Sequence, residues 1–151
     1  MLFKNQSDPI AAAMVGFPSR EWDEYIEHSR KVGADPDAVT RAIVADGVLV
    51  GDIMSWSQDG VREVGYWIDR AHWGNGIATT ALTAFLTEVT ERPLFAHVAR
   101  HNGGSARVLV KCGFAPRARG RAPRRRGPRG AHLHAELSSR THACAPPGPP
   151  G

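Results

Sequence analysis

Two glycines stand where a strand-like run is followed by a helical pattern, in the stretch YWIDRAHWGNGIATTALTAFL, residues 66–86. Small residues at such a junction let the backbone amides of about residues 74–79 converge at the positive end of the helix dipole. A nest of amides holds a pyrophosphate group without any lysine. The alternative is that Gly74 and Gly76 only make a tight turn, and the stretch alone does not decide between the two.

Two other phosphate loops fit this stretch poorly. A Walker loop ends in Gly-Lys-Ser/Thr, which is absent here. A dinucleotide fingerprint needs Gly or Ala three residues after Gly76, where Thr79 stands, and it needs a strand–helix–strand unit near the start of the chain. The Cys and His residues do not have zinc-site spacing, so we expect no metal.

The first element ahead of this junction is a helix at about residues 19–31. Ser19 is its expected N-cap, acidic residues follow in the first turn, basic residues lie in the last, and Gly33 stands just past its end. Trp22, Tyr25 and Ile26 recur at helical spacing. We therefore expect this helix to bury one apolar face.

Strands are indicated next by runs rich in Val and Ile that Asp-Gly pairs interrupt. They predict an antiparallel meander at about 40–45, 48–56 and 61–69. A helix from Gly76, a strand at 93–99 and a helix at 105–114 follow. The helix between two strands makes a crossover, so we expect an α/β fold with a mixed, mainly antiparallel sheet. The helix from Gly76 has its apolar face at Leu82, Phe85, Leu86 and Val89.

Composition divides the 151 residues into an expected globular domain, 1–114, and a tail, 115–151. The tail holds eight Arg and one Glu, a charge of +7, whereas residues 1–114 hold eleven Lys/Arg against fourteen Asp/Glu, a charge of −3. The tail is rich in Arg, Pro and Gly, so we expect it to be disordered. Two cysteines and no long apolar run indicate a cytoplasmic protein without a membrane partner.

The pattern VGYWIDRAHWGNGIATTALTAFL…LFAHVARHNGGSARVLVKCGF resembles the GNAT superfamily of acetyl-CoA-dependent N-acetyltransferases, especially its ribosomal-protein (RimJ/RimL-type) branch. The resemblance covers about residues 15–114. The superfamily's Q/R-x-x-G-x-G/A loop falls on Trp73, Gly76 and Ala78. The branch's N-x-x-S-x-R-V-L-x-K-x-G-F signature falls on Asn102, Ser105, Arg107, Val108, Leu109, Lys111, Gly113 and Phe114.

The resemblance implies that the strands at 61–69 and 93–99 splay apart to admit the pantetheine arm of acetyl-CoA, which is then the cosubstrate. Backbone groups near Trp67 and Ile68 would bind the arm and polarise the thioester carbonyl. Asn102 and Ser105 would contact the arm from the far side. The pyrophosphate would bind the loop residues Trp73, Gly74, Asn75, Gly76, Ile77, Ala78 and Thr79.

The same resemblance suggests the acid–base groups. Superfamily members often use a carboxylate on the strand before the glycine loop, which makes Glu63 the expected base; the alternative is a solvated strand residue beside Arg62. Many members place a Tyr acid where this chain has Leu109, so Ser105 or water would protonate the thiolate. Asp52 and His97 are weaker candidates for the base.

Other groups with reactive side chains have simpler explanations. His72 and His101 flank the two motifs, and lone loop histidines are more often surface residues. Cys112 lies on a helix without a base nearby in the sequence, so we expect it to pack in the core.

Both ends depart from the family pattern. The family has a strand near its start and two strands after Gly-Phe, and neither is evident in MLFKNQSDP or in the tail. We therefore expect a member truncated at its N-terminus, with an unrelated or frame-shifted segment after Phe114.

The leading function is acetyl transfer to a primary amine, either a protein N-terminal α-amine or a small-molecule amine, by direct attack in a ternary complex. A catalytically impaired CoA-binding relic is the second hypothesis. The third is non-specific contact with nucleic acid through the Arg-rich tail. The sequence does not indicate the oligomeric state.

Overall fold

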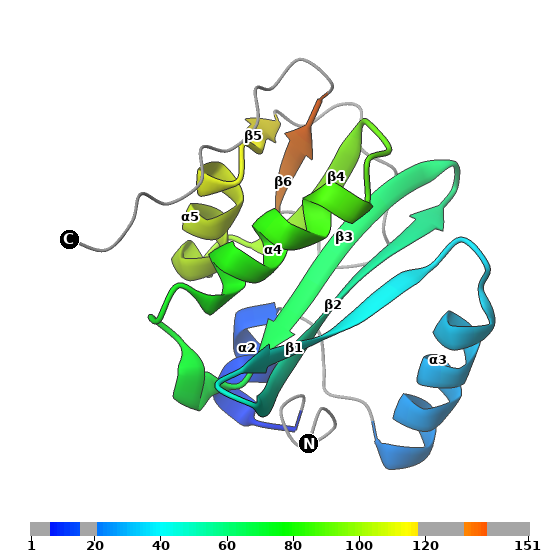
Figure 1. The fold of residues 1–151 in the computed structure, drawn as a ribbon, viewed down its shortest axis with the longest axis vertical. Coiled ribbons are helices and arrows are strands. Elements are labelled where there is room, and N and C mark those ends of the chain that lie inside the picture. The colour runs from blue at the N-terminus through cyan, green and yellow to red at the C-terminus, as the bar shows by residue number, and fades with distance from the viewer. Residues whose placement is uncertain (1–6, 16–20, 118–131, 139–151) are drawn as a thin grey trace.

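The computed structural model describes residues 7–15, 21–117 and 132–138, and Figure 1 shows their arrangement. The described elements, in chain order, are α2 (Pro9–Val15), α3 (Trp22–Ala34), β1 (Val39–Ala45), β2 (Val48–Gln58), β3 (Val61–Ile68), the 3-10 helix η1 (Arg70–His72), α4 (Ile77–Glu88), β4 (Leu94–Ala99), α5 (Gly103–Lys111), β5 (Ala115–Arg117) and β6 (His132–Leu137).

The strands form one six-stranded sheet in the order β1-β2-β3-β4-β6-β5. All neighbours are antiparallel except β3 and β4, which run parallel because α4 connects them as a crossover. The predicted mixed, mainly antiparallel sheet is thus confirmed. Both Asp-Gly turns of the meander have positive φ at each residue, for example 50° at Asp46 and 76° at Gly47, which suits a tight hairpin.

Strands β3 and β4 stay paired for only two positions, Arg62 with Leu94 and Glu63 with Phe95. Strand β3 continues to Ile68 and β4 to Ala99 without further pairs between them. The expected splayed strand pair is therefore present, and the strands part toward their C-terminal ends.

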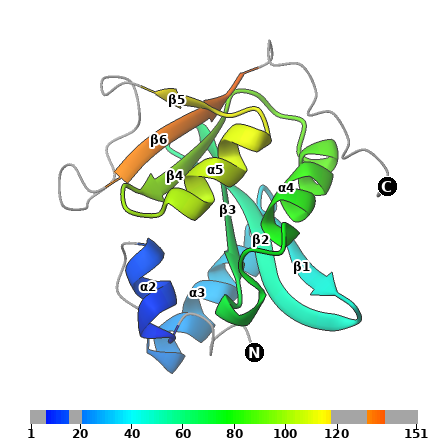
Figure 2. The ribbon, with the colours of Figure 1, turned by 90° about the vertical axis from the view of Figure 1, so that its left-hand side faces the viewer.

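The core lies on the α4 side of the sheet. Leu82, Phe85 and Val89 of the α4 segment are buried as expected, and α5 contributes Leu109. They pack against apolar side chains of β1 to β4 and β6, namely Ile43, Val50, Ile53, Val64, Ile68, Leu94, Ala96, Val98 and Leu137. Figure 2 shows α4 on one side of β3 and the helices α2 and α3 on the other.

Helix α3 differs from the prediction at both ends and on its apolar face. It begins at Trp22 with Glu21 at the N-cap position, Gly33 lies inside it, and Ser19 lies outside the described residues. The expected buried face is wrong, because none of its residues is buried and Trp22 remains 53% exposed. The helix stands away from the sheet, and a cavity occupies the space between them.

The described part of the tail contradicts the predicted disorder. Strand β6 pairs with β4 at six positions, from Leu137 with Leu94 to His132 with Ala99, and β5 pairs with β6. Its short alternation, HLHAEL, was hidden in a composition averaged over the whole Arg/Pro/Gly-rich tail. Because β5 and β6 lie at residues 115–117 and 132–137, the sheet extends beyond the expected domain boundary at residue 114. Residues 118–131 and 139–151 lie outside the described residues.

Helix α2 was not expected from the sequence. Asp8 caps it by accepting a hydrogen bond from the amide of Ile10 at 2.9 Å, and Pro9 occupies its first position. Asp8 also pairs with Arg70 at 3.1 Å. The Asp8-Pro9 pair is therefore a helix-start signal that sequence reasoning did not use. No helix in the described part of the chain has the length and apolar composition that a membrane crossing requires.

Candidate active site

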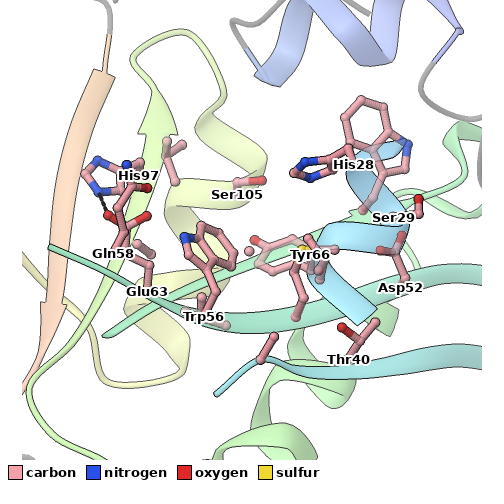
Figure 3. Close-up of a pocket in the computed structure, with 18 of the residues that line it drawn as sticks. His28, Ser29, Thr40, Asp52, Trp56, Gln58, Glu63, Tyr66, His97 and Ser105 are labelled. Atoms are coloured by element: carbon pink, nitrogen blue, oxygen red, sulfur yellow. Dashed lines mark hydrogen bonds and ion pairs between the residues drawn. The ribbon is translucent and has the colours of Figure 1, made fainter. Parts of the chain in front are cut away.

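A cavity of about 1030 Å³ opens where β3 and β4 part (Figure 3). The sheet forms its floor, α3 lies across from it, and α2 and the N-terminal half of α5 close one side. Figure 3 shows Glu63 and His97 at one end of the cavity, and Asp52 with His28 and Ser29 at the other. The cavity thus contains acidic groups at both ends.

The strand register decides which side chains face this cavity. Asp52 pairs with Trp67 and Trp56 pairs with Glu63, so these side chains share one face of the sheet with Met54 between them. All five line the cavity. Trp56 and Met54 were not singled out from the sequence, because their facing depends on the pairing between β2 and β3.

Glu63 is fully buried, with 1% of its surface exposed. Its Oε1 atom lies 3.2 Å from Nε2 of His97 on β4. His97 in turn packs edge-on against His134 of β6, with ring centroids 4.6 Å apart. A solvated Glu63 beside Arg62, the alternative drawn from the sequence, is therefore wrong. The structure instead pairs two candidate bases that the sequence could only name separately.

The glycine loop lies at the C-terminal end of β3 and does not line the cavity. Gly74 and Gly76 have φ of 79° and 74°, a left-handed conformation that glycine adopts without strain. Helix α4 has no side-chain cap, and its first backbone bond runs from Thr80 N to Gly76 O at 3.0 Å. The amides of Ile77, Ala78 and Thr79 therefore precede the first helical donor, Thr80 N, and have no acceptor within the helix.

The glycine loop has free space beside its glycines and is held by two side-chain hydrogen bonds. A Cβ atom added at Gly74 or Gly76 would meet nothing within 4 Å, so there is open space on the Cβ side of both glycines. Trp73 donates from Nε1 to the Ile68 carbonyl at 2.8 Å, and Asn75 donates from Nδ2 to the His72 carbonyl at 3.3 Å. The first bond holds the loop to the end of β3, and the second joins it to η1.

Asn102 and Ser105 stand together at the start of α5. The Asn102 Oδ1 accepts from the Ser105 amide at 3.0 Å, and its Nδ2 donates to the Met14 carbonyl at 3.0 Å. His101 adds a contact of 2.6 Å from Nε2 to the Ala13 carbonyl. Asn102 thus caps α5 and fixes α2, while both it and Ser105 line the cavity.

A sequence model of the Acetyltransferase (GNAT) domain matches residues 2–115. The chain belongs to the GNAT acetyltransferase family.

Solved GNAT structures resemble this chain in fold. RimJ of Mycobacterium smegmatis, in complex with CoA-disulfide, is 25% identical with a TM-score of 0.61, covering 78% of this chain and 61% of its own. A probable acetyltransferase is 26% identical with a TM-score of 0.63, covering 82% of this chain and 76% of its own.

Spermidine N-acetyltransferase of Vibrio cholerae, in complex with CoA and spermine, has a TM-score of 0.71 at 18% identity. The alignment covers 90% of this chain and 86% of that one, and at this identity it shows the fold alone. This GNAT chain spans less than two thirds of the RimJ chain. No curated protein matches it significantly.

Tyr66 is a cavity residue of this GNAT domain that sequence reasoning missed. Burial raises the pKa of Tyr66 to about 12; the nearby Ser105 side chain lowers it and Cys112 raises it further. The hydroxyl is buried, and apart from this interaction with Ser105, whose geometry is too poor for a regular hydrogen bond, it has no partner within the described residues. Leu109, the residue at the position of the expected tyrosine, is buried and also lines the cavity.

Asp52 faces the cavity of the GNAT domain without a hydrogen bond or ion pair from the described residues. Burial raises the pKa of its carboxyl from 3.8 to about 6. A half-buried carboxylate without a partner costs stability, and such groups occur mainly at functional sites. The described part of the chain contains no group of three or more residues suited to a metal ion.

Replacing Asp52 by Asn is expected to stabilise the protein at pH 7.5 by roughly 1–3 kcal/mol and to change little at pH 4. Between the ordinary carboxyl pKa and the raised value of about 6, the folded state binds a proton that the unfolded state does not. Wild-type stability therefore falls as pH rises through this window, whereas the amide does not titrate. Urea unfolding at both pH values measures the difference.

The matched control is Asp59→Asn, because Asp59 is exposed in the turn between β2 and β3 and Asn tolerates its positive φ of 52°. This variant should match wild type at both pH values. Equal stabilisation of Asp52→Asn at pH 4 and pH 7.5 would contradict the assignment of the raised carboxyl pKa.

Proposed function

We propose that this chain transfers the acetyl group of acetyl-CoA to a primary amine by direct attack in a ternary complex. The observation that carries the proposal is the cavity between parted β3 and β4, which joins the outer face of the sheet to α5. Family membership and the CoA-bound RimJ neighbour support the choice of cosubstrate.

In this proposal the amides of residues 74–79 bind the pyrophosphate, because α4 begins without a side-chain cap and there is free space beside both glycines. The pantetheine arm lies between β3 and β4, with Asn102 and Ser105 on its α5 side. Trp67 offers its side chain and backbone there, whereas the Ile68 side chain is buried in the core and only its backbone is available.

Chemistry then needs a base and an oxyanion site. The amine nitrogen attacks the thioester carbonyl, and Glu63, held by His97, accepts the amine proton directly or through water. Backbone N–H groups of β3 that point toward β4 lose their strand partner where the strands part. Such groups stabilise the developing oxyanion.

The charge of the cavity favours a cationic acceptor. Its described lining contains four carboxylates, from Glu24, Asp35, Asp52 and Glu63, and a single lysine, Lys31.

The share of the amine that is neutral, and therefore able to attack, ranks the possible acceptors. An α-amine of pKa ~7.8 is neutral about one time in ten at pH 7, far more often than a lysine amine of pKa ~10.4. We therefore rank a protein N-terminal α-amine, the substrate of the RimJ/RimL-type branch, and small amines of low pKa above lysine side chains.

The alternative is a catalytically impaired CoA-binding member of the family, which Leu109 favours because its side chain has no acidic proton to donate to the leaving thiolate. Turnover with a panel of α-amino peptides and small amines distinguishes the two. The nucleic-acid hypothesis concerns the tail, most of which lies outside the described residues.

Replacing Gly76 by Asp is expected to weaken acetyl-CoA binding about 10-fold or more, because the new carboxylate would occupy and repel the anion site. Gly76→Asn is the matched control: it has the same shape and the same tolerance of the left-handed φ of 74°, without the charge. Calorimetric titration of acetyl-CoA into both variants, at low and high salt, measures the difference.

The loss specific to Asp should shrink at high salt, since screening weakens repulsion between exposed charges. Wild-type affinity in Gly76→Asp would rule out the loop as the pyrophosphate site. A valine at this position would be a poorer test, because its β-branched side chain strains the backbone whether or not a ligand binds.

A further inference from the structure

The Tyr66 side chain lies where β3 has left β4. It follows Glu63, the last β3 residue that pairs with β4, and it lines the cavity between the two strands. Ser105 of α5 lines the same cavity, and both Ser105 and Cys112, at the end of α5, are close enough to influence the pKa of Tyr66. Figure 3 shows Tyr66 and Ser105 between the Glu63 end and the Asp52 end.

This hydroxyl is buried, and apart from its interaction with the Ser105 side chain, whose geometry is too poor for a regular hydrogen bond, it has no partner within the described residues. Buried polar groups are nearly always hydrogen-bonded, and each exception requires an explanation. A phenylalanine would fill the same space without the cost of an unpaired hydroxyl. A ligand acceptor atom in the cavity would supply the missing partner.

We infer that the Tyr66 hydroxyl donates a hydrogen bond to the thioester sulfur of acetyl-CoA as that sulfur leaves. This inference rests on the proposed acetyl transfer. The amine nitrogen forms the new C–N bond and its proton passes to Glu63; the C–S bond breaks and its electron pair stays on sulfur. The thiolate leaves with the Tyr66 hydrogen bond and takes its proton from solvent.

Tyr66 acts here as a hydrogen-bond donor and keeps its own proton. Burial raises its pKa to about 12, well above the value of ~8.5 for a thiol. A phenol so much less acidic than the leaving thiol does not transfer its proton, yet it remains a donor throughout the working pH range. Tyr66 therefore differs from a general acid, because the titration of a general acid would appear in the pH dependence of the rate.

Tyr66→Phe tests the inference, because it removes only the hydroxyl. With wild-type activity established on an amine acceptor, kcat should fall about 10- to 100-fold, the range expected for a hydrogen bond to a charged atom. The fall should be the same from pH 6 to pH 9, and the KM for acetyl-CoA should change little. Thermal melting should show a variant at least as stable as wild type.

A second measurement does not depend on turnover. Ultraviolet difference titration of bound CoA, against protein without CoA, reports the pKa of its thiol in the complex. A hydrogen bond to the thiolate lowers that pKa, so it should be higher in Tyr66→Phe than in wild type by about one unit or more. A purely structural role of Tyr66 would not change this value.

Ser105→Ala identifies the alternative donor. If Ser105 alone served the sulfur, Ser105→Ala would raise the bound thiol pKa and Tyr66→Phe would not, which would overturn the inference. Unchanged kcat and thiol pKa in Tyr66→Phe would overturn it as well. Failure of the wild-type chain to bind acetyl-CoA or acetylate any amine would instead refute the proposed function, so the two failures are distinguishable.

Discussion

Replacing Glu63 by Gln is expected to lower kcat by roughly 100- to 10,000-fold, the usual range for a general base. The amide keeps the size of the carboxylate and can still hydrogen-bond His97, whose Nε2 lies 3.2 Å from the Glu63 carboxylate. It has no basic oxygen to accept the amine proton. The free energy of unfolding should therefore change by no more than about 1 kcal/mol while turnover collapses.

The rate should be followed over a range of pH with one amine acceptor. Activity of Glu63→Gln should rise with pH toward wild type, because a larger share of the amine is then already neutral. Glu88→Gln is the matched control, since Glu88 pairs with Arg41 on the exposed surface and does not line the cavity. Wild-type kcat at pH 7 in Glu63→Gln would exclude Glu63 as the base.

Replacing Gly51 by Ala is expected to destabilise the fold by about 2–4 kcal/mol. A Cβ atom at Gly51 would lie 2.0 Å from the backbone carbonyl oxygen of Trp67, far inside contact distance. A backbone atom cannot move aside as a side chain can, so β2 and β3 would have to separate. Because Trp67 and Asp52 both line the cavity at this point, the cavity wall would shift as well.

Urea unfolding measures this loss, and Gly33→Ala provides the comparison. A Cβ atom at Gly33 would meet nothing within 4 Å, and the residue lies inside α3. That variant should be more stable by about 0.5–1 kcal/mol, because alanine restricts the unfolded chain and favours the helix. If Gly51→Ala stayed within 1 kcal/mol of wild type, the close approach of β2 and β3 would not be rigid.

The parts of the fold that depend on local sequence were predictable. The Asp-Gly turns specify two hairpins, and their hydrophobic runs specify the meander within three residues of its observed bounds. The two glycines likewise mark the junction between β3 and α4, and both have the positive φ that glycine adopts without strain. In each case the residues that give the sequence signal are the same residues that form the turn or strand.

The parts that depend on distant pairing were not predictable. His97 meets Glu63 because β3 and β4 pair for two positions, and no nearby residue signals that register. Tyr66 becomes a cavity residue only because the strands then part. The strand at 132–137 pairs with β4, which lies some 40 residues earlier in the chain. The residues next to this strand therefore give no signal of its partner.

The β4–β6 pairing has a consequence for the order in which the protein is completed during synthesis. His134 of β6 packs against His97, and α2 is fixed to the loop before α5 through Asn102. Residues from both ends of the described chain therefore contact residues that line the cavity. A nascent chain that has emerged only as far as α5 already contains Glu63, Tyr66 and the glycine loop, yet one edge of β4 is still bare. The reactive groups acquire their final surroundings only once residue 137 has joined the sheet.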